Sequence, residues 1–328
     1  MNVFIADKFE QEGIDGLEKL GCKVVYRPGT KGSALTQALR ESGAEILVVR
    51  STEVSKQTLL AAENLKFVIR AGSGVDTIDV DEATRLGVRV SNCPGMNAAA
   101  VAELTIGLMV TLDRRIVDET DDLKRGVWNK KEYSKALGLK GRTLGIIGMG
   151  RIGYEVAKRA RAFEMRIIYS DLFSRTDIEN ELGITRVAVE ELLRSADFVT
   201  LHVAGGRSSF HLIGARELRM MKPTAYLLNC ARGDVVDEEA VADALCEGRL
   251  AGAAFDVYAH EPGATDTKFT DPIAAAPRAY GTHHVGASTQ QAQQAVAQEV
   301  VHIVDSYRNK GDFKHCVNDK EAALVSRR

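Results

Sequence analysis

Short apolar runs alternate with helical patterns along the whole chain. The runs in its first part predict strands at 3–6, 23–26, 46–49, 67–70 and 88–91. A second set of runs predicts strands at 143–147, 166–170, 198–203, 225–229, 252–256 and 279–282. Strands that alternate with helices are typical of parallel sheets with helices on both faces. The pattern therefore predicts an α/β protein with two doubly wound parallel-sheet domains.

Two long helical patterns suggest how these domains are connected. One spans 98–115, with apolar residues at helical spacing, and we expect it to bridge the two domains. The other begins at Ser288, which forms a capping-box pattern with Gln291. Because its continuation needs a surface to pack on, we expect it to return to the first domain. The predicted domains are 1–98 completed by 285–328, and 99–284.

A glycine motif opens the second domain and predicts a dinucleotide site. Gly148 permits a tight turn after a strand, Gly150 lets the backbone approach a pyrophosphate, and Gly153 allows close packing of the following helix. Asp171 ends the next predicted strand, 171 − 148 = 23 positions after the first glycine. A carboxylate there accepts hydrogen bonds from a ribose diol and repels a 2′-phosphate. The motif therefore predicts NAD in preference to NADP, although Arg175 nearby weakens that preference slightly.

Composition and charge exclude other classes of function. Hydrophobic residues make up 45% of the 328 positions and charged residues 27%, as in globular proteins. The formal net charge of −2 gives no indication of a nucleic-acid or membrane partner. The five cysteines are scattered, without metal-ligand spacing, and we expect reduced thiols in a cytoplasmic protein and no metal site.

Three further segments each begin where a predicted strand of the second domain ends: 229–233, 259–262 and 283–286. Parallel sheets bind ligands at the carboxyl ends of their strands, so these loops should face the cofactor. His284 is the candidate base for a hydroxyl proton, Glu261 its orienting carboxylate, and Arg232 the cation for a substrate carboxylate. Taken singly, each also fits a structural role in a turn or loop; together, beside a nucleotide site, they favour oxidation of a 2-hydroxy acid.

The same residues resemble those of a known family, the D-isomer-specific 2-hydroxyacid dehydrogenases. The resemblance covers nearly the whole chain and includes the segments 70–76, 94–97, 101–103, 148–153, 232–237, 261–262 and 284–286. It implies a Rossmann cofactor domain, a flavodoxin-like substrate domain, and a cleft between them. It also implies that Arg232 binds the substrate carboxylate, that Glu261 and His284 form the acid/base pair, and that the protein is a homodimer joined through its cofactor domains.

The resemblance extends the set of candidate contacts. The candidate cofactor contacts are Gly148, Gly150, Arg151, Ile152, Gly153, Asp171, His202 and Asp256. The candidate substrate contacts are Arg50, Ser51, Arg70, Ser73, Gly74, Asn97 and Arg232. Arg50 and Arg70 end adjacent predicted strands, where two cations would suit a phosphate or a second carboxylate, although solvated strand-end arginines are an alternative.

Within the family, the segments around Arg50 and Arg70 most resemble members that oxidise 3-phosphoglycerate. The alternatives are a glyoxylate or hydroxypyruvate reductase, another D-2-hydroxyacid dehydrogenase, and an NAD-sensing protein similar to a corepressor. Two departures from the family are evident: His283 replaces a proline, and the loop after His202 lacks its usual proline and threonine. The chain ends soon after Asn318, so we expect no serine-binding regulatory domain.

Overall fold

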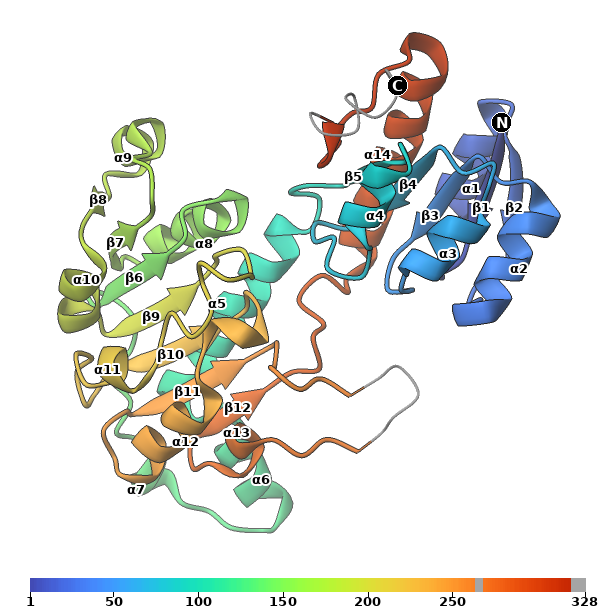
Figure 1. Ribbon diagram of the computed structural model, residues 1–328. Coiled ribbons are helices and arrows are strands. Elements are labelled where there is room, and N and C mark those ends of the chain that lie inside the picture. Colours follow the sequence, from blue (N-terminus) through green and yellow to red (C-terminus); the bar gives the residue numbers. More distant parts are fainter. Residues whose placement is uncertain (263–267, 320–328) are drawn as a thin grey trace. The chain divides into compact units, whose positions relative to one another are not determined.

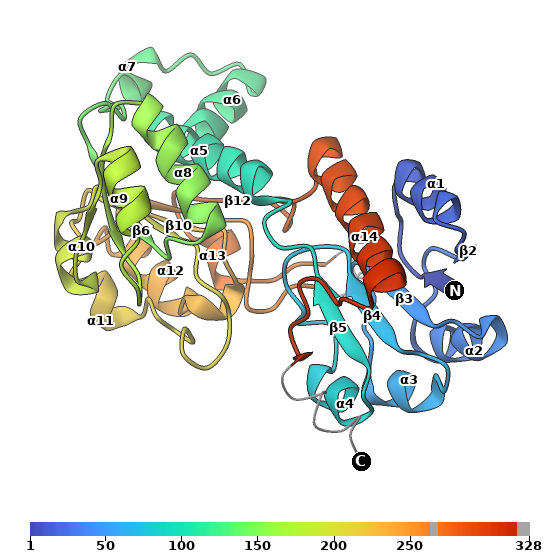
Figure 2. The ribbon, with the colours of Figure 1, turned by 90° about the horizontal axis from the view of Figure 1, so that it is seen from above.

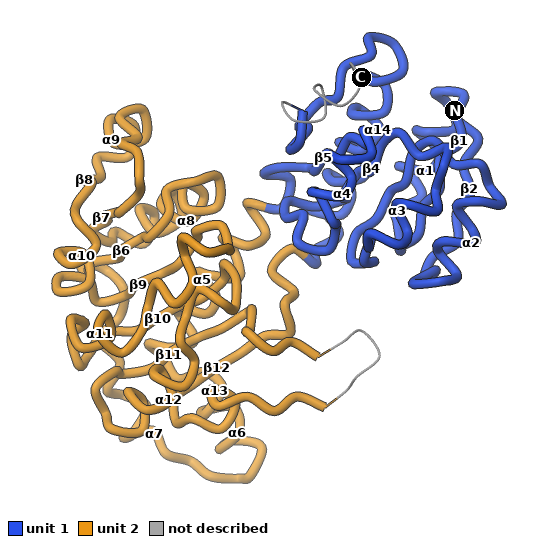
Figure 3. The backbone as a smooth tube through the Cα atoms, viewed as in Figure 1, with its two compact units in different colours: residues 1–97, 288–328 blue, residues 98–287 orange. Residues whose placement is uncertain are grey.

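The structure is a computed structural model that describes residues 1–262 and 268–319, and it divides into two compact units (Figure 3). Unit 1 contains Met1–Asn97 and Ser288–Arg328, and unit 2 contains Ala98–Ala287. The sequence predicted that the first domain ends at residue 98 and resumes at residue 285, whereas unit 1 ends at residue 97 and resumes at residue 288. Residues 320–328 of the expected first domain lie outside the described residues. Among the described residues, no helix has both the length and the apolar character needed to cross a membrane.

Unit 1 is built on a parallel five-stranded sheet with the order β2-β1-β3-β4-β5 (Figure 1). Its strands are β1 (Asn2–Ile5), β2 (Lys23–Tyr26), β3 (Ile46–Val49), β4 (Phe67–Arg70) and β5 (Arg89–Asn92). Its helices are α1 (Gln11–Lys19), α2 (Gly32–Ser42), α3 (Lys56–Ala61), α4 (Val80–Arg85) and α14 (Gln290–Lys310). The strand order reverses between β1 and β3, as in flavodoxin-like folds.

Alternating side chains explain why helices cover both faces of this sheet. In β1, Val3 and Ile5 join the apolar cluster that includes residues of α1 and α14, whereas Phe4 joins the cluster of α2, α3 and α4. All three side chains are buried. A strand buried on both sides reads as a continuous apolar run, which is the pattern in the sequence. Figure 2 shows α14 beside α1 on their shared face.

Unit 2 contains a parallel seven-stranded sheet with the order β12-β11-β10-β9-β6-β7-β8. Its strands are β6 (Thr143–Ile147), β7 (Arg166–Ser170), β8 (Thr185–Arg186), β9 (Phe198–Leu201), β10 (Tyr226–Asn229), β11 (Gly252–Phe255) and β12 (Ala279–Gly281). Its α-helices are α5 (Ala98–Arg114), α6 (Ile116–Lys124), α7 (Lys130–Tyr133), α8 (Arg151–Ala162), α9 (Thr176–Leu182), α10 (Val189–Ser195), α11 (Ala215–Leu218), α12 (Glu238–Cys246) and α13 (Pro272–Ala275).

The order of strands in unit 2 places a topological switch point between β6 and β9. The chain leaves β6 towards β7 on one side and later returns to β9 on the other, which is the Rossmann arrangement. In such a sheet the two loops that follow β6 and β9 diverge and leave a crevice for a nucleotide. The expected class of fold, two doubly wound α/β sheets, is confirmed.

Some local predictions need correction. The long second helix begins at Gln290, and its N-cap lies one residue later than expected. Thr289 and not Ser288 caps it, with Oγ1 accepting a hydrogen bond from the N–H of Ala292 at 3.2 Å. The helix expected to bridge the domains, α5, lies in unit 2 and packs on α8. The sequence did not predict the short edge strand β8, because both of its residues are exposed and polar and form no apolar run.

A buried ion pair holds the end of α5 against the start of the unit 2 sheet. Asp113 Oδ1 lies 2.9 Å from Nη1 of Arg142, and Asp113 Oδ2 accepts the N–H of Gly138. The Arg142 guanidinium lies 4.3 Å from the ring centre of Phe198. Both charged side chains are largely buried, so removal of one leaves the other without compensation.

We therefore expect Asp113→Ala to lower the free energy of unfolding by about 3–5 kcal/mol. The matched control is Lys140→Ala, which breaks an exposed pair with Glu164 and is expected to cost less than about 1 kcal/mol. Urea unfolding followed by circular dichroism measures both. Equal effects of the two substitutions would contradict the importance assigned to the buried pair.

Candidate active site

The loop between β6 and α8 is shaped by its glycines. Gly148 has a φ of 96°, and a Cβ there would lie 2.6 Å from the carbonyl oxygen of His202. A Cβ at Gly153 would overlap the carbonyl oxygen of Gly148. Gly150, the N-cap of α8, instead faces open space, with no atom within 4 Å of the position of its Cβ. This loop therefore leaves the start of α8 accessible, and it fits the pyrophosphate of a dinucleotide.

Asp171 is tied to this glycine loop. It directly follows β7, and its Oδ2 accepts the N–H of Met149 at 2.7 Å. Arg175 donates from Nη1 to the carbonyl oxygen of Met149 at 2.8 Å, so the cation is also held at the loop. Asp171 and Arg175 thus both bind the backbone of Met149 in the glycine loop. From the sequence, the two residues were predicted to have opposing effects on the choice between NAD and NADP.

The loop after β9 forms the other side of the switch point. His202 is partly buried, with Nε2 3.0 Å from Oγ1 of Thr200, and its buried Nδ1 has no hydrogen-bond partner among the described residues. Burial lowers the pKa of His202 to about 3, so its imidazole is neutral. Ser209 closes the loop after His202, because its hydroxyl donates to the carbonyl oxygens of Ala204 at 2.6 Å and Gly206 at 3.2 Å.

Arg232 follows β10 in a turn that is fixed on two sides. Asn229 Nδ2 donates to the carbonyl oxygen of Arg232 at 2.9 Å. A Cβ at Gly233 would overlap the peptide that joins Tyr258 to Ala259, so only glycine permits this turn to pack against the next strand-end loop. The Arg232 side chain is partly exposed and donates to the carbonyl oxygen of Ala231.

Glu261 and His284 are paired by a hydrogen bond of 2.8 Å between Oε2 and Nδ1. This bond raises the pKa of His284, although burial and the charge of Arg232 oppose the rise. Burial favours the neutral form of Glu261, but His284 and Arg232 outweigh it and lower the pKa of that carboxyl. The charge of Arg232 thus acts on both partners, and the three predicted residues share one location. About half of the His284 side chain is exposed and accessible to a ligand.

Asp256 holds the loop that carries His284. Its Oδ1 accepts from the hydroxyl of Thr282 at 2.6 Å and from the N–H of Val285 at 2.8 Å, and its Oδ2 accepts from Gly286 at 2.9 Å. His284 has a φ of 52°, a left-handed conformation uncommon for a residue with a side chain. Such a conformation persists where its surroundings impose it, and Asp256 supplies that constraint.

The remaining candidates lie in unit 1. Arg50 and Ser51 follow β3, and sequence reasoning missed the residue that holds them: Asp7 Oδ2 accepts the N–H groups of Arg50, Ser51 and Thr52 at 2.6, 3.0 and 2.9 Å. Because of these bonds, the pKa of Asp7 lies below its ordinary value despite burial, which acts in the opposite direction. The signal was available, since Asp7 follows the strand beside β3 in a doubly wound sheet.

The other unit 1 candidates cluster after β4 and β5. A Cβ at Gly72 would overlap the guanidinium of Arg70, so glycine allows that side chain to fold back over the turn. Ser73 donates to Oδ1 of Asn97 at 2.7 Å, which connects the turn after β4 to the end of unit 1. Gly74 lies next to Ser73 in the same turn.

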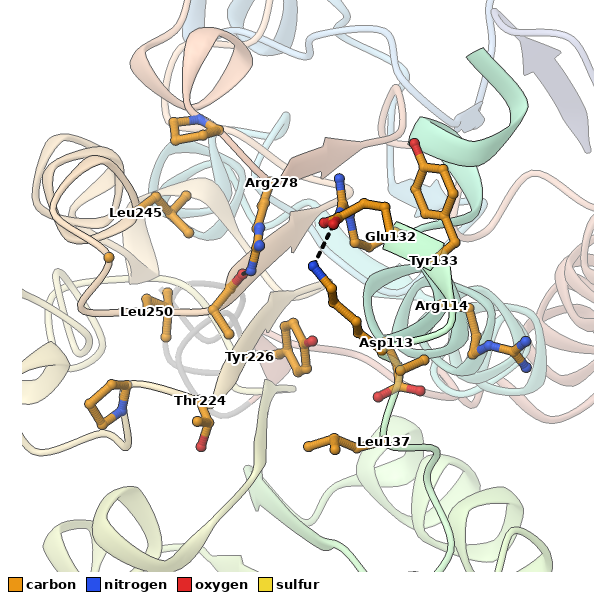
Figure 4. Close-up of a pocket in the computed structure, with 17 residues that line it drawn as sticks. Asp113, Arg114, Glu132, Tyr133, Leu137, Thr224, Tyr226, Leu245, Leu250 and Arg278 are labelled. Atoms are coloured by element: carbon orange, nitrogen blue, oxygen red, sulfur yellow. Dashed lines mark hydrogen bonds and ion pairs between the residues drawn. The ribbon is translucent and has the colours of Figure 1, made fainter. Parts of the chain in front are cut away.

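The pockets of unit 2 lie at different edges of its sheet. One of about 520 Å³ is formed where strands begin, with Tyr226 at the start of β10 and Arg278 just before β12 (Figure 4). Another of about 590 Å³ includes Glu261 and His284 in its lining. Because the glycine loop also follows a strand, the second pocket lies at the chemically relevant edge. No cluster of three or more metal-ligating side chains occurs among the described residues.

Comparison with known proteins identifies the family. Residues 106–286 match the family described as D-isomer specific 2-hydroxyacid dehydrogenase, NAD binding domain. The chain is 37% identical to a glyoxylate reductase of Thermococcus litoralis, over 99% of this chain and 98% of that protein. The protein therefore belongs to the NAD-dependent D-2-hydroxyacid dehydrogenases.

Other relatives carry different names. The chain is 39% identical to a D-3-phosphoglycerate dehydrogenase of Methanocaldococcus jannaschii over 93% of its own length, but it spans only 57% of that relative. Its fold is similar to that of a D-lactate dehydrogenase of Aquifex aeolicus crystallised with NAD and lactic acid, with a TM-score of 0.82 and 28% identity over 97% of this chain and 99% of the other.

The pairing of Glu261 with His284 can be tested without turnover. Glu261→Gln removes the negative charge that stabilises the imidazolium, so we expect the pKa of His284 to fall. Titration by NMR of histidine-labelled protein measures this pKa, and His284→Gln assigns the resonance. Glu239→Gln, which neutralises an exposed carboxylate, serves as control. An unchanged His284 pKa in Glu261→Gln would show that the pair does not interact in solution.

Proposed function

We propose that this protein interconverts a small D-2-hydroxy acid and its 2-oxo acid with NAD. The observation that carries the proposal is the 2.8 Å bond between Glu261 and His284, with the charge of Arg232 acting on both residues. Arg232 binds the substrate carboxylate through a planar pair of N–H donors. During oxidation, the neutral His284 takes the hydroxyl proton at Nε2, because Nδ1 faces Glu261. When bound, NAD supplies the nicotinamide ring that accepts the hydride from C2.

Each of the other residues has a defined part in this proposal. Glu261 fixes the orientation of the imidazole and stabilises its protonated form. Asp256 holds the His284 loop in its left-handed turn. The residues Gly148, Gly150, Arg151, Ile152 and Gly153 receive the pyrophosphate, Asp171 the ribose, and His202 lies on the opposite side of the crevice. The oxidation needs His284 deprotonated, so its rate is expected to rise with pH through the pKa of His284, and the reduction to fall.

We propose 3-phosphoglycerate as the substrate, which would be oxidised to 3-phosphohydroxypyruvate as in serine biosynthesis. Arg50 supports this, because Asp7 fixes its backbone at the carboxyl end of β3 and burial lowers the pKa of its half-buried guanidinium. A desolvated cation favours an anionic partner such as phosphate. Ser51, Arg70, Ser73, Gly74 and Asn97 would complete the substrate-binding surface. The relatives named D-3-phosphoglycerate dehydrogenase agree with this choice.

A glyoxylate reductase is the second candidate, and one observation favours it. The chain is 37% identical to the glyoxylate reductase of Thermococcus litoralis over 99% of its own length. A reductase of this kind would use Arg232, Glu261 and His284 without needing Arg50 and Arg70. The two candidates therefore differ in the part that unit 1 plays.

We also propose that the protein is a homodimer joined through unit 2. The helices α6 and α7 contain no buried residue. The segment around them exposes large apolar side chains, namely Ile116, Val117, Leu123, Val127, Trp128 and Leu137. Such a patch marks an interaction surface, and a second copy of unit 2 would cover it.

The five cysteines, none of which forms a disulfide, support a reducing compartment such as the cytoplasm.

His284→Gln tests the proposed chemistry. General acid–base catalysis contributes about 10²- to 10⁴-fold, so kcat should fall by at least about 100-fold. NADH fluorescence over a panel of 3-phosphoglycerate, glycerate, lactate and glyoxylate measures turnover, and fluorescence titration should show NAD binding intact. His283→Ala changes the neighbouring imidazole and is expected to keep most activity. Full activity in His284→Gln would exclude this residue as the base.

Arg50→Ala distinguishes the two substrate candidates. Loss of one charge-assisted contact to phosphate costs roughly 1.5–3 kcal/mol, so KM for 3-phosphoglycerate should rise about 10- to 100-fold. KM for glycerate should change little. Arg27→Ala, an exposed arginine of the same unit, is the control and should alter neither. Equal effects of Arg50→Ala on both substrates would contradict the phosphate role.

A further inference from the structure

Two carboxyl groups that the proposed chemistry does not use are buried beside the active-site loop. Glu238 is the first residue of α12, and Asp271 is the N-cap of α13; both are about 94% buried. Burial raises the pKa of Glu238 to about 7, and the neighbouring carboxyl group of Asp271 adds to the rise. Two carboxylates in such a place repel each other unless one holds a proton.

The hydrogen-bond pattern around Asp271 shows where that proton is needed. Asp271 Oδ1 accepts the N–H of Ile273 at 2.9 Å and so caps α13. Asp271 Oδ2 is buried, and no donor among the described residues reaches it. An unsatisfied carboxylate oxygen is costly away from water. A protonated Glu238 has a carboxyl O–H group that can donate a hydrogen bond to Asp271 Oδ2.

The second oxygen of Glu238 connects the pair to the catalytic loop. Glu238 Oε1 accepts the N–H of Ala259 at 2.9 Å, two residues before Glu261. In the same loop, the N–H of Tyr258 donates to Oε1 of Glu261 at 3.1 Å, which aims the other oxygen at His284. The backbone that orients Glu261 is therefore anchored on Glu238.

We propose that Glu238 and Asp271 share one proton, and that this carboxyl pair positions the loop 258–261 so that Glu261 is directed at His284. The proton stays on Glu238 and is donated to Asp271 Oδ2, while the other oxygen of Glu238 accepts from Ala259. Neither carboxyl group forms or breaks a covalent bond to the substrate. Glu238 is a positioning residue, and its effect on catalysis rests on the function proposed above.

Nearby charges make the shared proton important for Glu261. The groups that act on Glu238 are Asp271 at the start of α13 and Glu261 on the loop, and both raise its pKa. Burial raises the pKa of Tyr258 to about 12, and the charges of Asp256 and of the same three carboxyl groups add to the rise. A proton on Glu238 therefore reduces the negative charge near Glu261. The loop 258–261 can then keep its hydrogen bond from the N–H of Ala259 to Glu238.

Two substitutions separate the shared proton from simple loss of a side chain. In Glu238→Gln, the amide oxygen accepts from Ala259 and the amide N–H₂ donates to Asp271, so kcat should stay within about twofold of wild type. In Glu238→Ala both bonds are lost; kcat should fall about tenfold with KM within about twofold, because misplacement of a catalytic group acts mainly on the chemical step. The pKa of His284, followed by NMR, should fall in Glu238→Ala and stay unchanged in Glu238→Gln.

The control is Glu239→Ala, the exposed neighbour on α12, which should alter neither kcat nor the His284 pKa. If Glu238→Ala does not fold, Glu238→Asp replaces it, because its shorter side chain cannot span Ala259 and Asp271 together; the same two losses are expected.

Two outcomes would overturn the inference. Wild-type kcat and His284 pKa in Glu238→Ala, or in Glu238→Asp, would show that the pair does not position Glu261. A Glu238→Gln protein as impaired as Glu238→Ala would exclude the shared proton. If the wild-type protein turns over no 2-hydroxy or 2-oxo acid, the proposed function fails, but the NMR titration of His284 still decides whether Glu238 positions Glu261.

Discussion

The parallel direction of all the strands in unit 2 is the constraint on which its site depends. Because every strand points the same way, the loops after β6, β9, β10, β11 and β12 meet at one edge of the sheet. Residues separated by more than a hundred positions in the sequence, such as Gly148 and His284, therefore belong to the same edge. The common strand direction is therefore sufficient to bring together the glycine loop, Arg232, Glu261 and His284.

Within this frame, close backbone approaches and buried carboxylates fix the loops. Gly148 lies against the loop of His202, and Gly233 lies against the peptide before Ala259. Asp256 holds the His284 loop and Asp7 holds the turn of Arg50, each with at least three hydrogen bonds. Both units thus use the same solution: an acid at the end of one strand accepts the N–H groups of a loop that follows its neighbour.

The sequence was sufficient for most of the fold and for part of the site. The strands 46–49, 67–70 and 143–147 were predicted with the observed bounds, because each is an almost completely buried run. The strands 23–26 and 166–170 were also predicted with the observed bounds, although neither is buried along its whole length. The helices α6 and α7 gave no signal, since they bury no residue and so have no apolar stripe. Asp7, Glu238 and Asp271 were missed for another reason: their partners lie far away in the sequence, and a lone acid after a strand or at a helix start looks like an ordinary cap.

Two of the histidines of unit 2 show why residue type alone does not define a site. His202 and His284 both follow strands at the same edge, and the sequence predicted His202 as a cofactor contact and His284 as the base. Burial alone lowers the pKa of the His202 imidazole to about 3, so it stays neutral. His284 is half exposed and bonded to a carboxylate, so its pKa rises above the ordinary value. Only a group whose two protonation states are both accessible near neutral pH transfers a proton efficiently, and the environment selects His284. The carboxyl groups follow the same rule, since Glu261 is held ionised by its partners whereas Glu238 is driven towards its protonated form by burial and by Asp271.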